Sequence, residues 1–173
     1  MAIPAVSLAL FLLLAYAMDR DLFRYPLVQG RGYEREQVSV AETIRKYDAI
    51  LIDFYDTNGV PALLNEFPAT KAMRHAIFRD IGFLRDTGRT LVQDMADLTP
   101  VDVKITSYNT AEAVMLEQIN YQYQRGNNRM PITEMKGMGC GFRYYLIREN
   151  NQWVVSEWDP VFVEEPINRE FLY

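Results

Sequence analysis

Histidine and cysteine are almost absent from the 173-residue sequence, since each occurs once, as His75 and Cys140. A single cysteine excludes an intrachain disulfide and a zinc site built from several cysteines. A single histidine leaves little from which to build a histidine-based triad or metal site. We therefore expect no metal and no cofactor, and no catalytic signature stands out in the chain.

An excess of positive charge is also missing. The chain has 18 Lys and Arg against 23 Asp and Glu, for a net charge of -5. Because neutralising phosphates requires clustered Lys and Arg, we expect no nucleic-acid partner. Hydrophobic residues make up 49% of the chain, which excludes global disorder. The length suits one domain with a terminal appendage.

The first segment has no charged residue from Ala2 to Ala17, and Asp19 and Arg20 then follow. As a helix, residues 2–18 would span about 26 Å, slightly less than a hydrocarbon core of about 30 Å. Three interpretations compete: a retained membrane anchor, a cleaved signal peptide, or an apolar helix of a soluble domain. As a signal peptide, the segment has the expected small-x-small ending at residues 15–17 but lacks the Lys or Arg expected near its start. We predict the retained anchor, a single-pass membrane protein that contacts the bilayer through residues 2–18, with its folded domain outside the cytoplasm.

The chain then divides into four parts. Residues 1–25 are the predicted anchor or uncleaved signal segment. Residues 26–37 are charged, contain Pro26, Gly30 and Gly32, and are predicted to be a juxtamembrane linker. Residues 38–166 form the predicted folded domain, and residues 167–173 form a tail.

Three helices are predicted after the linker. Ser39 and Glu42 have the spacing of a capping box, and apolar residues at helical spacing follow until Asn58-Gly59 ends the helix. A short helix is predicted to begin at Pro61 and to end before Pro68. A third runs from about Thr70 to Thr87, with Gly88 as its terminator.

The hydrophobic period changes from helical to two after Leu98, which indicates strands. Alternating segments cover residues 101–109, 111–124, 142–149 and 152–165, and Asn150-Asn151 supplies a tight hairpin turn. Helices followed by strands predict an α+β fold, with three helices packed on a curved four-stranded antiparallel sheet.

The final hairpin carries a resemblance to a known family. The aromatic strand "GFRYYLIRENN" followed by "QWVVSEWDP" resembles the last hairpin of the nuclear transport factor 2-like superfamily, and the three preceding helices are similar to its opening. The resemblance extends from Val38 to Pro166 and implies a cone-shaped α+β fold.

Two kinds of function are implied by this resemblance. One branch of the superfamily contains small enzymes, such as ketosteroid isomerase and scytalone dehydratase, which place an acid or base inside the cone. The other contains non-enzymatic modules tethered to membranes, such as the inner-membrane assembly factor of type IV secretion systems. An N-terminal anchor followed by this domain resembles the second branch.

Two sets of residues are weak catalytic candidates. Glu117 shares a strand face with Tyr121, so it would be an acid of raised pKa beside tyrosine donors if that face lines the cone. If the opposite face points inward, Glu117 is solvated. Asp53 and His75 could form a carboxylate–imidazole pair, but surface positions explain both more simply.

Aromatic and apolar residues near the C-terminus are candidates for partner contacts, because an apolar chain end is unusual unless it docks. The sequence predicts a membrane-anchored scaffold or assembly subunit that binds other subunits of a membrane complex. The alternative is a small-molecule binding protein, or an isomerase- or dehydratase-like enzyme with a polar residue in the cone. The predicted interface residues are Trp158, Phe162, Phe171, Leu172 and Tyr173.

Overall fold

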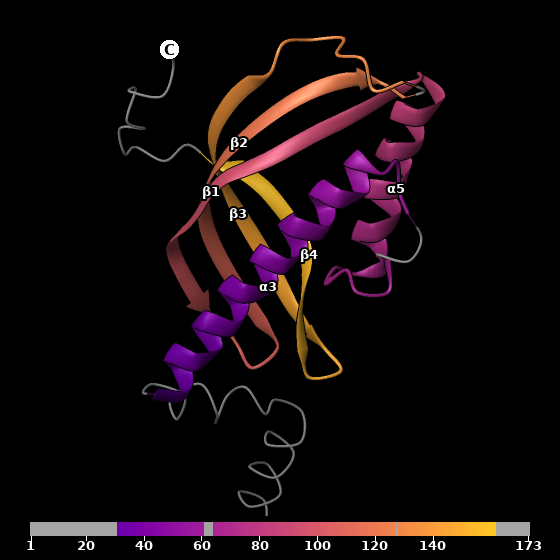
Figure 1. The fold of residues 1–173 in the computed structure, drawn as a ribbon. Coiled ribbons are helices and arrows are strands. Elements are labelled where there is room, and N and C mark those ends of the chain that lie inside the picture. Colours follow the sequence, from indigo (N-terminus) through magenta and orange to yellow (C-terminus); the bar gives the residue numbers. More distant parts are fainter. Residues whose placement is uncertain (1–30, 61–63, 127, 162–173) are drawn as a thin grey trace, which may run out of the picture.

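The computed structural model describes residues 31–60, 64–126 and 128–161 of the chain. These residues contain two helices followed by four strands. Figure 1 shows α3 lying obliquely across the sheet, with α5 beside one end of the long β1–β2 ribbon. The elements are α3 (Arg31–Asp56), α5 (Lys71–Asp86), β1 (Arg89–Ile105), β2 (Thr110–Arg125), β3 (Lys136–Glu149) and β4 (Gln152–Val161).

The four strands form one antiparallel sheet in the order β1-β2-β3-β4, as predicted. β1 shifts register at two places, between Met95 and Asp97 and between Pro100 and Asp102, and the β3–β4 pair shifts near Leu146. Because a bulge adds a residue to one strand only, each shift bends the sheet. The sheet therefore has a concave face, and α3 lies over it (Figure 1).

The core lies between α3 and the concave face. Residues at helical spacing along α3, including Val40, Ile44 and Tyr47, are fully buried. They pack with alternate residues of the strands, such as Met115 of β2 and Leu146 of β3. Burial of these apolar side chains is the main favourable contribution to folding.

Helix α5 confirms the helix predicted from Thr70 to Thr87. Thr70 is the N-cap, and its hydroxyl oxygen accepts a hydrogen bond from the Met73 N–H at 3.3 Å. Ile77 and Ile81 are its buried residues. The helix ends before Gly88, whose φ of +67° is a conformation that glycine adopts readily.

Helix α3 begins at Arg31, so the predicted start at Ser39 is wrong. Ser39 lies inside the helix, where its carbonyl oxygen accepts a hydrogen bond from the Thr43 hydroxyl at 2.8 Å. Residues 31–37, which the sequence assigned to a linker, are helical. Contacts distant in sequence explain the difference: Tyr33 packs against the core, and the Gln37 side chain donates to the Val103 carbonyl oxygen of β1.

The prediction of three helices is also wrong, since the described part of the chain contains α3 and α5 alone. Residues 61–63 of the predicted short helix lie outside the described residues. Leu64 is the single helical residue of the described remainder, which continues as a turn and an extended segment. This segment is anchored by Phe67 and Ala69, both buried, and by hydrogen bonds of Pro68 and Thr70 to Val155.

The predicted transmembrane helix and single-pass membrane location are contradicted. Across the described residues, no helix combines the length and apolarity needed to cross a bilayer. The apolar segment behind that prediction, residues 2–18, lies outside the described part of the chain.

Strand β1 begins at Arg89, although alternation in the sequence becomes clear only at Val101. Its first half pairs with the second half of β2, as in Leu91 with Tyr123 and Met95 with Ile119. The two register shifts and Pro100 interrupt the period of two, which is why the pattern concealed this half of the strand.

The packing of α3 on the sheet predicts a large effect of truncating Ile44. Ile44→Ala should lower the free energy of unfolding by about 2–5 kcal/mol, because a fully buried side chain leaves a cavity. Val38→Ala, at a position that is 55% exposed on the same helix, should change it by at most about 0.5 kcal/mol. Urea denaturation measures both, and equal effects would contradict the placement of α3.

Candidate functional site

Strand β2 directs Glu117 toward the helices. Alternate residues of this strand are buried on the concave face, including Ala113, Met115 and Ile119, and Glu117 lies in the same row with only 4% of its surface exposed. Glu117 therefore does not lie on the opposite face of β2, where it would be solvated. The interpretation of Glu117 as an acid among apolar neighbours has the required geometry.

Two further polar residues meet Glu117 in the core. Asp48 comes from α3 and Tyr144 from β3, and both are buried. The Tyr144 hydroxyl lies 3.1 Å from Asp48 Oδ1 and is also in hydrogen-bond contact with Glu117 Oε1. One phenol therefore joins two carboxyl groups and connects α3 to the middle of the sheet. We call these three residues the acid cluster.

Burial dominates the electrostatics of the acid cluster. Burial raises the pKa of Glu117 to about 7, against a smaller lowering by the Tyr144 hydrogen bond. Burial and the charge of Glu117 raise the pKa of Asp48 well above its usual value. The pKa of the Tyr144 hydroxyl is raised by burial and by both carboxyl groups, so the phenol keeps its proton.

The interior around the acid cluster is filled by side chains. Tyr47, Phe67 and Met115 are each at most 1% exposed, and the Tyr47 ring stacks on Phe67 at 4.8 Å and meets Tyr144 edge-on at 6.0 Å. Two surface grooves are lined by described residues, and neither is lined by a residue of the acid cluster. A substrate has no visible route to Glu117 through either groove.

The other catalytic candidates lie away from the acid cluster. Tyr121 is half-buried on the same face of β2, and its ring lies 6.4 Å from that of Tyr123. Asp53 and His75 are exposed on α3 and α5. In the described part of the chain, no group of three His, Cys, Asp or Glu residues is arranged to hold a metal ion.

Of the predicted interface residues, the structure describes Trp158. Its side chain is 41% exposed on β4, and its ring packs edge-on against Phe142 at 5.3 Å. Phe162, Phe171, Leu172 and Tyr173 lie outside the described residues.

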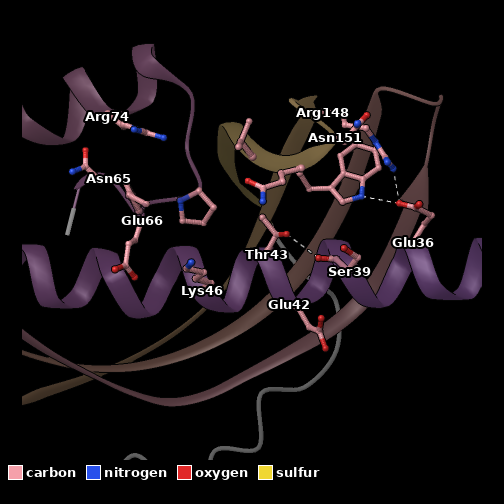
Figure 2. Close-up of a pocket in the computed structure, with 15 residues that line it drawn as sticks. Glu36, Ser39, Glu42, Thr43, Lys46, Asn65, Glu66, Arg74, Arg148 and Asn151 are labelled. Carbon is pink, nitrogen blue, oxygen red and sulfur yellow. Dashed lines mark hydrogen bonds and ion pairs between the residues drawn. The ribbon is translucent and has the colours of Figure 1, made fainter. Parts of the chain in front are cut away.

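A polar groove of about 460 Å³ lies on the outer side of α3, and we call it the α3 groove. It runs between α3, the segment Asn65–Pro68 and the β3–β4 hairpin. Figure 2 shows Arg74, Asn65 and Glu66 at one end, Glu36 and Arg148 at the other, and Lys46 and Thr43 along the helix between them.

One end of the α3 groove is built around a partly buried ion pair. Arg148 Nη2 lies 2.5 Å from Glu36 Oε2, and the Trp153 indole N–H donates to the same oxygen at 2.9 Å. The Arg148 guanidinium also stacks over the Trp153 ring at 4.3 Å. The two contacts of Glu36, with Arg148 and with the Trp153 indole, are dashed in Figure 2. They fix this end of the groove.

The opposite end is held by Arg74. Its Nε donates to the Ala69 carbonyl oxygen at 2.8 Å and its Nη1 to that of Leu64 at 3.2 Å. Three exposed charges also line the groove without an ion pair to any described residue: Glu42, Lys46 and Glu66.

Sequence reasoning missed the Glu36–Arg148–Trp153 cluster. Glu36 was assigned to a linker, and it is 112 residues from Arg148 and 117 from Trp153. No local spacing connects such positions. The signal that was available is a tryptophan and an arginine facing each other on one hairpin, because Arg148 and Trp153 are register partners.

Comparison of the structure with solved structures identifies its fold. The intermembrane space region of the chloroplast protein ARC6 superposes with a TM-score of 0.63 and 11% identity, over 73% of this chain and 97% of that one. At this identity the match establishes a shared fold and nothing about function. The sequence matches no protein-family model and no curated protein.

The described residues place α3 on the concave face of a curved antiparallel sheet, which is the arrangement that the resemblance to the nuclear transport factor 2-like superfamily implies, so the resemblance is confirmed at the level of fold. An NTF2-like protein involved in plasmid conjugation and an NTF2-like protein of unknown function from Prochlorococcus marinus also match. Their TM-scores are 0.36 and 0.34, with 7% and 6% identity. They cover 57% and 51% of this chain, and 44% and 62% of theirs. Such low scores carry no argument about function.

The groove geometry predicts that Glu36→Gln destabilises the protein. The variant weakens the only ion pair that Arg148 makes among the described residues, so the free energy of unfolding should fall by about 1–2 kcal/mol. Asp86→Asn is the matched control, because the Arg85–Asp86 pair is exposed and should contribute less than about 0.5 kcal/mol. Equal losses in urea denaturation would show that the buried end of the groove is not held by this pair.

The surroundings of Cys140 predict that its thiol reacts slowly with alkylating reagents. Burial and the nearby Glu117 charge raise the pKa of Cys140 to about 11, which reduces its thiolate fraction. At pH 8, iodoacetamide should alkylate Cys140 in the folded protein about a hundredfold more slowly than in the urea-unfolded chain. Mass spectrometry follows the reaction, and equal rates in the two states would refute this environment.

Proposed function

We propose that the chain is a non-enzymatic binding domain of a larger protein assembly, and that the α3 groove is where a polypeptide partner docks. The single observation that carries the proposal is a contrast in accessibility. The residues suited to acid–base chemistry are enclosed in a packed core, whereas the α3 groove is open and carries charges without an ion pair to any described residue.

The α3 groove offers hydrogen bonds that suit a polypeptide backbone. The Val155 N–H donates to the Pro68 carbonyl oxygen at 2.8 Å, and the Val155 carbonyl oxygen accepts from the Thr70 N–H at 2.9 Å. Val155 thus directs its backbone groups away from β3, to the edge of β4 that the segment Pro68–Thr70 covers. Because this direction alternates along a strand, Trp153 directs its own N–H and carbonyl toward the groove. An extended segment could bind there as strands bind to sheet edges.

The side chains of the groove suit a partner with charges of both signs. Lys46 and Glu42 lie on α3 and Glu66 lies opposite, so a docking segment meets acidic and basic groups along its length. The fixed ends of the groove reduce the side-chain ordering required on binding.

The fold is compatible with a binding or scaffold role, since the best-superposing structure described above is one region of a larger chloroplast protein. The partners are proposed to be other subunits of one assembly. A second contact surface stays a prediction, and it consists of Trp158, Phe162, Phe171, Leu172 and Tyr173.

The alternative, a small-molecule binding protein or an isomerase- or dehydratase-like enzyme, is favoured by one observation, the raised pKa of Glu117 beside Tyr144. It requires the packed side chains around Glu117 to separate and admit a substrate.

The binding proposal predicts a specific effect of Lys46→Glu. The full chain, tagged and crosslinked in its native cells, should recover a defined partner, and Lys46→Glu should reduce that recovery at least about tenfold, because charge reversal opposes a complementary segment. Lys71→Glu is the control, since Lys71 is exposed on α5 outside the groove. Equal recovery with wild type, Lys46→Glu and Lys71→Glu would refute the groove as the docking site.

A further inference from the structure

We propose that Asp48, Glu117 and Tyr144 form one buried proton-binding site, and that loss of its proton loosens α3 from the sheet. This inference does not depend on the partner-binding role of the α3 groove. It concerns the opposite, buried face of the same helix.

The hydrogen bonds of Tyr144 require a protonated carboxyl group. A phenol has one proton to donate, yet the Tyr144 oxygen is in hydrogen-bond contact with Asp48 Oδ1 and with Glu117 Oε1. Suppose that Tyr144 donates its proton to one of the two carboxylates. Its contact with the other carboxyl group is then a hydrogen bond only when this other group carries a proton and donates it to the phenol oxygen. With both carboxyls ionised, one contact places two acceptors against each other.

Among the residues that the structure describes, no positive charge balances a second carboxylate in the cluster. The titratable groups that face the cluster are Tyr47 of α3 and Cys140 of β3, and Tyr55, further along α3, interacts with Tyr47. β1 places Leu98 opposite Glu117, and β4 places Trp158 opposite Tyr144. Across the described residues, no Lys, Arg or His makes an ion pair with Asp48 or Glu117.

Asp48 itself is enclosed. It is 4% exposed, and its Oδ2 is buried without a hydrogen-bond partner among the described residues. An unpartnered oxygen is far less unfavourable in a neutral carboxyl than in a carboxylate, because burial penalises charge most. The enclosure and the hydrogen-bond pattern therefore agree that the pair shares at least one proton.

The consequence for stability has a defined sign. In the unfolded chain Glu117 ionises near its ordinary pKa of 4.5, whereas in the fold burial raises its pKa to about 7. Between these values the folded state binds more protons, so stability falls as pH rises. Each pH unit in this window should lower the folding equilibrium constant about tenfold. A carboxylate stabilised by an ion pair gives the opposite trend.

The loosening should centre on α3, because Asp48 is the residue of that helix within the cluster and its neighbours Tyr47 and Ile44 are fully buried against the same sheet. Two negative charges in this interface repel each other across the α3–sheet contact.

Urea unfolding of the full chain at several pH values between 5 and 8 tests the proposal. We expect the wild-type folding equilibrium constant to fall about fortyfold from pH 5 to pH 7, and we expect Glu117→Gln to remove most of that fall because the neutral amide has no proton to lose. Glu42→Gln, an exposed change on α3, should leave the fall intact. Asp48→Asn, a second isosteric variant, should make the fall shallower without removing it, because one carboxyl group of the pair is lost while Glu117 stays buried.

Two results would overturn the proposal. One is a wild-type folding equilibrium constant that stays constant or rises as the pH is raised from 5 to 7. This measurement does not depend on any variant being able to fold. The other is a fall that is as steep in Glu117→Gln as in the wild type. Neither measurement involves a partner, so a result that overturns the proton-binding site leaves the proposal about the α3 groove untouched. In the same way, a failure to recover a partner leaves the proposal of the proton-binding site untouched.

Discussion

The contact of Tyr144 with two buried carboxyl groups is the polar link on which the position of α3 depends. Apolar packing brings a helix to a concave sheet face but tolerates sliding and rotation, because the hydrophobic effect is non-directional. A phenol from β3 that bonds Asp48 of α3 and Glu117 of β2 is satisfied in one register only. The same residues that resemble a catalytic site therefore act, in a filled interior, as a positional constraint.

Helix α3 divides the molecule into a closed side and an open side. Its inner face carries Ile44, Tyr47 and Asp48 into the core, while its outer face carries Glu42 and Lys46 along the α3 groove. The two faces belong to one rigid helix. By fixing the position of α3, the acid cluster therefore also fixes the position of the α3 residues that line the α3 groove. The bulged sheet supplies the curvature, and the β3–β4 hairpin supplies Arg148 and Trp153 for the opposite wall. The accessible polar groups of the α3 groove thus lie on the outer side of α3, away from the acid cluster.

Much of this architecture is predictable from local patterns, and the exceptions have physical reasons. The antiparallel sheet, α5 and the row of β2 that holds Glu117 follow from periodicity and capping. The true start of α3 does not, because Tyr33, Glu36 and Gln37 are held by residues distant in sequence. Bulges hid the first half of β1, and tertiary hydrogen bonds rather than helix propensity shape the segment that ends at Thr70. Asp48 was overlooked since a single acid on an amphipathic helix resembles a solvated residue until Tyr144 is placed beside it.

The state of the two carboxyl groups is the most direct measure of this account. Carbon-13 NMR of the side-chain carboxyls of Asp48 and Glu117, followed in the folded protein as pH is raised, reports their ionisation one residue at a time. The account predicts that at least one of them stays neutral at pH 6, with Glu117 titrating near 7 and the signal of its partner responding to the same step. Two carboxyls that both ionise near 4 and independently of each other would contradict it.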